Sequence, residues 1–179
     1  PFPRQRSLRK TKRTEGRHVR IEGIGMKFKL IYPKWKKLAG QTEFHLPPHG
    51  PVVFAATIPE DWDVEFTDEN VEPLVFDDSP DFVGVSMMLT SQVKRGWEIA
   101  DTYRRRGIKV MFGGIATMLH AEETMRHADA VFLGEAEGRM EGVFEDFRNN
   151  RLKPCYDYMA DPPPVSLVGP ARRSILKEE

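Results

Sequence analysis

Short apolar runs alternate with helix-like segments from Met26 onward, and this alternation is the main structural signal in the sequence. Apolar runs of strand length occupy residues 27–33, 64–66, 81–89, 108–114 and 129–138. Strands of about five residues that alternate with helices of 10–15 residues are typical of βαβ units around a parallel sheet. The pattern therefore predicts an α/β fold with right-handed crossovers and an open, doubly wound sheet.

Residues 91–107 form the clearest predicted helix. Val93, Trp97 and Ala100, with Tyr103 after them, share one face at helical spacing, and charged residues fill the opposite face. Gly107 is a suitable residue to end this helix. Further helices are expected at residues 51–59, at 117–126 and from about 139 to 149.

Three of the predicted strands, containing VGVSMML, KVMFGG and AVFLG, are almost continuously apolar, which indicates that helices cover both of their faces. Five strands predict a Rossmann-like, flavodoxin-like sheet with the order 2-1-3-4-5, and ligands bind at the carboxyl ends of the strands in such sheets. Residues 26–150 would form this domain. Residues 151–179, which include PPP at 162–164, are interpreted as an extended linker that leaves the domain.

Composition narrows the function classes by exclusion. The chain has 179 residues and 40% hydrophobic content, which suits one domain with a tail and excludes wholesale disorder. A single cysteine, Cys155, excludes a disulfide framework and an iron–sulfur cluster held by this chain alone, and we interpret it as a bystander thiol. No apolar run reaches the roughly 20 residues of a transmembrane helix, and no secretory signal is evident. A cytoplasmic location is therefore expected.

The formal net charge of zero hides a basic start. Residues 1–25 contain eight Lys and Arg against two Glu. We interpret them as a disordered leader, or as sequence upstream of a natural start at Met26. The alternative is an arm that binds nucleic acid or a membrane surface, which predicts steeply salt-dependent binding. The leading expectation is that nucleic acid is not a partner.

Small residues stand where three of the predicted strands end. They are Ser86, the pair Gly113 and Gly114, and Gly134. Small residues let a bulky ligand approach the backbone, and the helix N-termini that follow supply unpaired N–H donors. Tight strand-to-helix turns are the alternative explanation. The repetition of small residues at matching strand ends favours a ligand cleft.

The apolar residues around this expected cleft favour a large flat ligand over a triphosphate, with ordinary core packing as the alternative. They are Met87, Met88, Leu89, Ile115, Ala116 and Met118. Glu135 and Glu137 follow the fifth strand and would either bond a ligand's amide groups or cap the next helix, and the cap is favoured for Glu137. Asp68 and Glu69 follow the second strand and would face the same opening or remain solvated.

Familiar nucleotide and phosphate motifs are absent. The chain has neither GxGxxG after its first strand nor GxxxxGK[ST]. A phospho-receiver domain would need an acidic residue where Ser86 stands. His45 and His49 lie in the long loop beside the expected cleft and are candidate ligands of a metal or cofactor, although loop histidines more often are only surface residues.

Several segments together resemble one family. LPPHGPVVFAATIP, DFVGVSMMLTSQVKRGWEIADTYRRRG, VMFGGIATMLHAEETMRHADAVFLGEAEG and PARRSIL, in this order, resemble the N-terminal cobalamin (B12)-binding domain of B12-dependent radical SAM proteins, an Fe-S oxidoreductase family. The resemblance spans about residues 26–176. It implies a Rossmann-like sheet and a corrinoid that lies flat over the strand ends, with its lower side towards the domain.

The resemblance also implies a cofactor-binding set and no catalytic or metal-ligating residue in this chain. The set is Ser86, Met87, Met88, Leu89, Thr90, Gly113, Gly114, Ile115, Ala116, Gly134, Glu135, Ala136 and Glu137. Two family-related motifs are missing. The DxHxxG of classical corrinoid carriers is absent, EFHLPPHG being the nearest stretch, and so is CxxxCxxC. A [4Fe-4S] cluster and S-adenosylmethionine are therefore expected only in a downstream radical SAM domain.

The function that the resemblance implies is cobalamin binding on behalf of a full-length radical SAM enzyme. That enzyme would carry out methyl transfer or related radical chemistry on a small-molecule, lipid-like or pigment-like substrate, with its radical SAM domain as the partner of this domain. The chain alone is expected to bind cofactor without turnover. The alternative is a corrinoid-free, Rossmann-like protein-interaction domain, which large side chains filling the cleft would favour.

Overall fold

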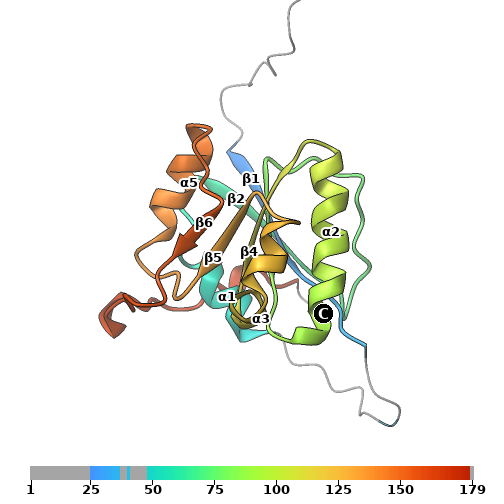
Figure 1. The fold of residues 1–179 in the computed structure, drawn as a ribbon. Helices are drawn as coiled ribbons and strands as arrows, with labels where there is room; N and C mark the ends of the chain where they lie inside the picture. Colours follow the sequence, from blue (N-terminus) through green and yellow to red (C-terminus); the bar gives the residue numbers. More distant parts are fainter. Residues whose placement is uncertain (1–24, 37–39, 41–47, 178–179) are drawn as a thin grey trace, which may run out of the picture.

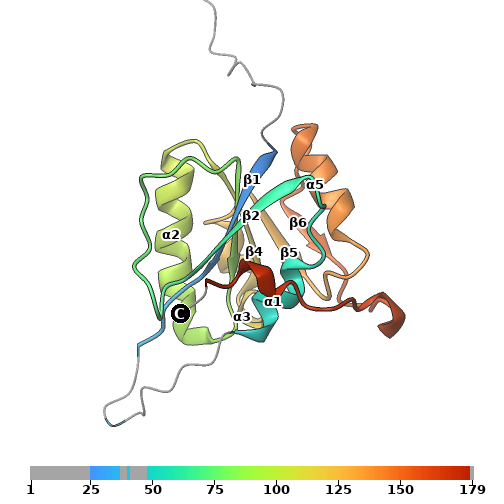
Figure 2. The same ribbon diagram turned by 180° about the vertical axis from the view of Figure 1, so that it is seen from behind.

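Six parallel strands form the centre of the molecule in the computed structural model, which describes residues 25–36, 40 and 48–177 (Figure 1, and from behind in Figure 2). Their order is β2-β1-β3-β4-β5-β6. The strands are β1 (Met26–Tyr32), β2 (Trp62–Asp68), β3 (Phe82–Ser86), β4 (Lys109–Gly113), β5 (Ala130–Leu133) and β6 (Cys155–Asp157). The predicted α/β class and the 2-1-3-4-5 order are confirmed, and β6 extends the sheet by one strand.

The helices follow the predicted periodicity with two differences. They are α1 (His49–Ala55), α2 (Val93–Arg105), α3 (Ile115–Leu119), α4 (Ala121–Met125) and α5 (Met140–Arg148), with 3-10 turns η1 (Thr90–Gln92), η2 (Val165–Leu167) and η3 (Arg173–Ile175). The helix expected at 117–126 is broken into α3 and α4, because His120 between them has the non-helical angles φ −129° and ψ 38°. The helix expected at 51–59 starts earlier, at His49, and ends at Ala55.

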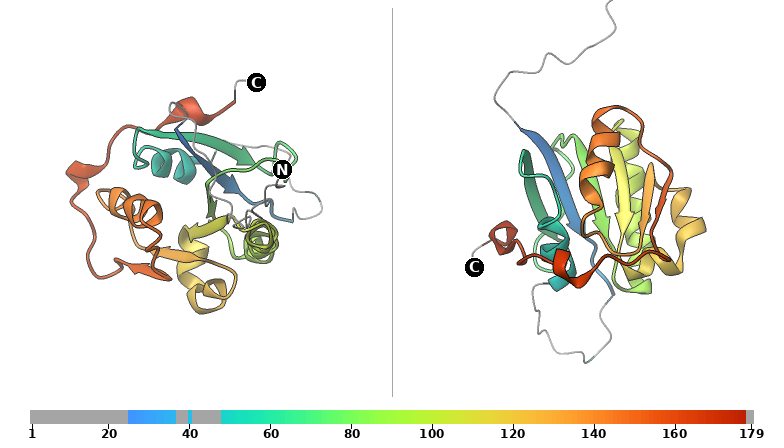
Figure 3. Two further views of the ribbon diagram at one scale, coloured as in Figure 1. Left: turned by 90° about the horizontal axis from the view of Figure 1, so that it is seen from above. Right: turned by 90° about the vertical axis from the view of Figure 1, so that its left-hand side faces the viewer.

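The helices cover both faces of the sheet, as Figure 3 shows from above. Helices α1 and α5 pack on one face over a core rich in aromatic rings, where the Trp62 and Phe144 centroids lie 4.7 Å apart. Helix α2 packs on the other face over a mostly aliphatic core that also contains Phe112. Gly84 in β3 is required by this packing, because a Cβ there would lie 2.4 Å from the ring of Phe28. Within the described residues, no helix is both long and apolar enough to cross a membrane.

The segment 151–179, expected to leave the domain as an extended linker, contacts it again at several places. Cys155 pairs with Val131, which places this cysteine in edge strand β6 and not apart from the strands. Further on, Ile175 is 9% exposed and packs into the core on the α1 face. The N–H of Arg172 donates to the carbonyl oxygen of Val52 at 2.9 Å. A three-residue strand is too short to produce a periodic pattern, so β6 could not be predicted from periodicity.

Candidate functional site

A cleft of about 370 Å³ opens at the carboxyl ends of the central strands, on the face of the sheet that α1 covers. The wall is mostly apolar. The residues from the sheet and from the loops that follow it are Leu30, Gly84, Val85, Ser86, Met88, Met111, Gly113, Gly114, Ile115, Met118, Phe132, Gly134, Glu135, Ala136 and Glu137. Helix α1 adds His49, Gly50, Val53 and Phe54, and the C-terminal segment adds Val168.

Most of the residues proposed from sequence for cofactor binding line this cleft, as does Met118. The ones that do are Ser86, Met88, Gly113, Gly114, Ile115, Gly134, Glu135, Ala136 and Glu137. Met87, Leu89, Thr90 and Ala116 do not. Met87 and Ala116 are fully buried in the core under α2, whereas Leu89 and Thr90 lie at the start of η1 and are exposed. For Met87 the backbone direction explains this, because successive extended residues point to opposite sides, and its neighbours Ser86 and Met88 line the cleft.

His49 was expected in a loop beside the cleft; it lies instead in the first turn of α1, where it is exposed and lines the cleft, and His45 lies outside the described residues. Sequence reasoning missed the other α1 residues on this side of the cleft, Gly50, Val53 and Phe54. Gly84 and Met111 could have been found, because each stands two residues before a proposed site residue and so shares its face of the strand. Val168 follows a proline-rich stretch, and no local pattern points to it.

The glycines at the strand ends fall into two kinds. Gly114 has φ +93°, and a Cβ there would lie 2.4 Å from the carbonyl oxygen of Met87. Gly134 has φ +102°, and its Cβ would lie 2.9 Å from the backbone of Tyr158. The fold itself requires both. A Cβ on Gly113, by contrast, would meet no atom within 4 Å. Of these three glycines, Gly113 alone has open space where a side chain would stand, and that space belongs to the cleft.

A comparison with known protein families points to the same part of the molecule as the cleft. The model of the B12 binding domain matches residues 35–144, more than half of the chain. This chain belongs to the B12-binding domain family. The matched range contains α1, the strands β2 to β5 and every proposed cofactor-binding residue.

A curated relative of this B12-binding domain is the bacteriochlorophyllide d C-8(2)-methyltransferase of Chlorobaculum tepidum. The two are 35% identical over 119 residues, which is 66% of this chain and 26% of the relative. The chain thus spans about a quarter of that protein's length. No solved structure matches the chain.

A buried glutamine holds one wall of the cleft of this B12-binding domain in place. Gln92 is fully buried, and its Oε1 accepts the N–H groups of Met88 at 2.8 Å and Leu89 at 2.9 Å. Its Nε2 donates to the carbonyl oxygen of Pro33 at 2.6 Å. One side chain therefore joins the loop after β3 to the loop after β1. Because Met88 lines the cleft, this contact fixes the position of the cleft wall.

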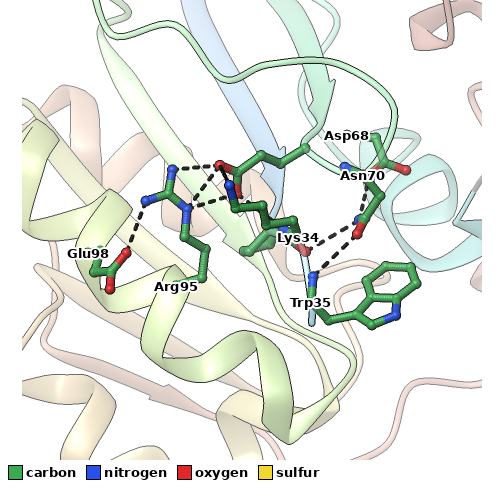
Figure 4. Close-up of polar contacts among 8 residues, drawn as sticks. Lys34, Trp35, Asp68, Asn70, Arg95 and Glu98 are labelled. Carbon is green, nitrogen blue, oxygen red and sulfur yellow. Dashed lines mark hydrogen bonds and ion pairs between the residues drawn. The ribbon is translucent and has the colours of Figure 1, made fainter. Parts of the chain in front are cut away.

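A second polar cluster lies at the carboxyl end of β2 (Figure 4). Arg95 from α2 donates through Nε to both carboxylate oxygens of Glu69, at 2.9 and 3.0 Å, and also bonds Glu98 at 3.0 Å. The backbone N–H of Lys34 donates to Glu69 at 3.1 Å, and that of Trp35 to Asn70 at 3.3 Å. These contacts attach the loop after β1 to β2 and α2.

This cluster answers the question that the sequence left open for the acids after β2. The Glu69 side chain is 4% exposed and lines no part of the cleft. Burial opposes its ionisation, but the hydrogen bonds from Arg95 and from the Lys34 N–H outweigh burial and hold the pKa of the Glu69 carboxyl below its usual value. Asp68 accepts hydrogen bonds from Asn70. Both acids are therefore structural here.

The two acids after β5 differ from one another. Glu135 is exposed, whereas Glu137 is 8% exposed, and both line the cleft. The prediction that Glu137 caps the next helix is wrong, because α5 begins after Arg139 and has no side-chain cap. The chain turns at Gly138, with φ +70°, between Glu137 and the start of α5.

The cleft fits a large, flat, mostly apolar group that also carries hydrogen-bonding substituents. Its walls are apolar, its floor at Gly113 is open, and a buried carboxylate lies at one side. In the described part of the chain, no three His, Cys, Asp or Glu side chains gather as a metal site would require.

Proposed function

We propose that this domain binds a cobalamin-type corrinoid across the cleft and presents it to the catalytic domain of a larger radical SAM enzyme. The observation that carries the proposal is the open cleft itself, whose wall is apolar and whose floor at Gly113 has no side chain. The family match names the same ligand. The protein-interaction alternative expects large side chains that fill the cleft, whereas large residues such as Phe54 and Phe132 form its wall and leave a space of about 370 Å³.

The residues of this chain would bind and orient the corrinoid and exclude water from its lower side. The bound cobalt centre would supply the methyl-transfer chemistry. Met88, Ile115 and Met118 offer adaptable apolar contacts to a flat ring. Met88 and Ile115 are 40% and 49% exposed, so they remain available for contact with a ligand or with a domain that covers it.

The reaction of the whole enzyme is a further part of the proposal. The relative is named as a methyltransferase that acts on a bacteriochlorophyllide, which supports methyl transfer to a small-molecule, lipid-like or pigment-like substrate. The [4Fe-4S] cluster and S-adenosylmethionine would belong to a radical SAM domain of the same full-length protein. Pro170 to Leu176 (PARRSIL), which resembles the stretch before that domain, packs near α1 through η3.

The test uses the full chain, mixed with hydroxocobalamin and then desalted. We expect retained colour and a perturbed cobalt spectrum. Gly113→Val should reduce corrinoid affinity at least about tenfold, equal to about 1.4 kcal/mol, because its side chain occupies the open floor. Gly142→Val is the matched control, since Gly142 is exposed on α5, has no atom within 4 Å of an added Cβ and lies outside the cleft. A colourless wild-type chain would refute the proposal, and wild-type affinity in Gly113→Val would refute the placement.

A further inference from the structure

Glu137 lies where two hollows of the molecule meet. It lines the cleft described above, and it also lines a neighbouring hollow of about 300 Å³ between α1, the start of α5 and the C-terminal segment. Val53 lines both spaces as well. A group on the rim of a ligand in the cleft would therefore meet the Glu137 carboxylate at the boundary between them.

The Glu137 carboxylate has no partner within the part of the chain that the structure describes. No hydrogen bond or ion pair reaches it; the residue as a whole is 8% exposed, and its carboxylate oxygens keep some access to solvent. The nearby Arg139 forms an ion pair with Asp161 and stacks over the ring of Tyr158 instead. Nor does the carboxylate cap α5. A carboxylate on a largely buried residue has little room for water, so an unpaired one that lines a cleft is available to hydrogen-bond a ligand group there.

The chemistry of that ligand group follows from the charge. A buried carboxylate only accepts hydrogen bonds, so its partner must donate N–H or O–H groups. A cationic partner would suit the charge, but the rest of the wall is apolar and suits an uncharged ligand. A primary carboxamide supplies two N–H donors without a charge. A ligand carboxylate at the same place would place two negative charges together in a partly desolvated site.

We propose that Glu137 selects corrinoids whose peripheral side chains are carboxamides over those that carry carboxylates, by accepting N–H hydrogen bonds from a carboxamide. This inference rests on the proposed function and names the form of the ligand within it. Glu137 is a specificity-determining residue in this proposal.

The experiment measures the affinities of the full chain for cobinamide, which carries carboxamides, and for cobyrinic acid, which carries carboxylates. Hydrogen bonds to charged groups are worth enough to change affinity by roughly tenfold to a hundredfold. Wild type should prefer cobinamide by at least about tenfold. Glu137→Leu should weaken cobinamide binding about tenfold. Glu137→Gln should reduce the preference about tenfold, because a glutamine amide donates to a carboxylate as readily as it accepts from an amide.

Glu145→Gln is the matched control, because it removes the same charge from an exposed position on α5 that lines neither hollow; both affinities should remain as in wild type. Thermal unfolding of every variant monitors folding, and a mere loss of structure would weaken both corrinoids alike and leave their ratio unchanged. Suppose that wild type binds cobinamide and that the ratio of the two affinities in Glu137→Gln and in Glu137→Leu equals the ratio in wild type. The selection by Glu137 is then wrong, and the proposed function stands. If wild type binds neither corrinoid, both proposals fail.

Discussion

The Gln92 contact makes a prediction that needs no ligand. Gln92→Leu keeps a side chain of similar size in a fully buried position but removes three hydrogen bonds, to the N–H groups of Met88 and Leu89 and to the carbonyl oxygen of Pro33. These bonds connect segments 59 residues apart in the sequence. Their loss should release the loop after β3 from the end of β1.

The size of the effect follows from the number of bonds and from what can replace them. Each intramolecular hydrogen bond contributes about 0.5–1.5 kcal/mol, and a buried group left without a partner costs about 1–3 kcal/mol. Water can reach Met88 and Leu89, which are 40% and 43% exposed, and the Pro33 oxygen keeps a contact with Asn70 at 3.5 Å. We therefore expect a loss of about 2–4 kcal/mol, which lowers the Tm of a chain of this length by roughly 5–15 °C.

Thermal unfolding followed by circular dichroism measures this loss. Ser91→Leu is the matched control, because Ser91 lies on the same 3-10 turn, is exposed and should change stability by no more than about 0.5 kcal/mol when replaced. A Gln92→Leu variant that melts at the same temperature as Ser91→Leu would show that the buried glutamine does not hold the two loops together.

Two further predictions concern groups near the strand ends. Gly114→Ala should destabilise the protein by about 1–3 kcal/mol, because φ is +93° and the new Cβ meets the Met87 carbonyl oxygen. Gly113→Ala should be nearly neutral, and a urea titration of both variants measures the difference. Equal losses of stability would contradict the distinction between the two glycines. Because the folded-state pKa of Glu69 lies below its usual value of 4.5, its contribution is present above about that pH and is lost as the pH falls through the lower, folded value. Glu69→Gln should therefore be less stable than wild type at pH 7 and lose less stability on acidification, and parallel pH profiles would refute this.

Helix α2 and the apolar strands could be predicted because their signals are local. The buried positions Val93, Ala100 and Tyr103 recur at helical spacing, and a strand covered on both faces must be apolar throughout. The strand-end glycines could also be predicted locally, because each directly follows an apolar run. The edge strand β6 gave no such signal, since three residues are too few for a pattern and its pairing partner, β5, lies more than twenty residues earlier in the sequence.

By itself, the sequence determined the fold class, the strand order, the edge of the sheet where a cleft forms and the family. These depend on periodicity, on small residues at strand ends and on motifs, all of which are read along the chain. Only the tertiary structure decided which residues face the cleft, that α1 closes one side of it and that Glu69 is paired with Arg95. It also decided that Glu137 is largely buried and finds no partner among the described residues. The partner of a polar side chain depends on which distant segments the crossovers bring together, and residue order alone does not contain that information.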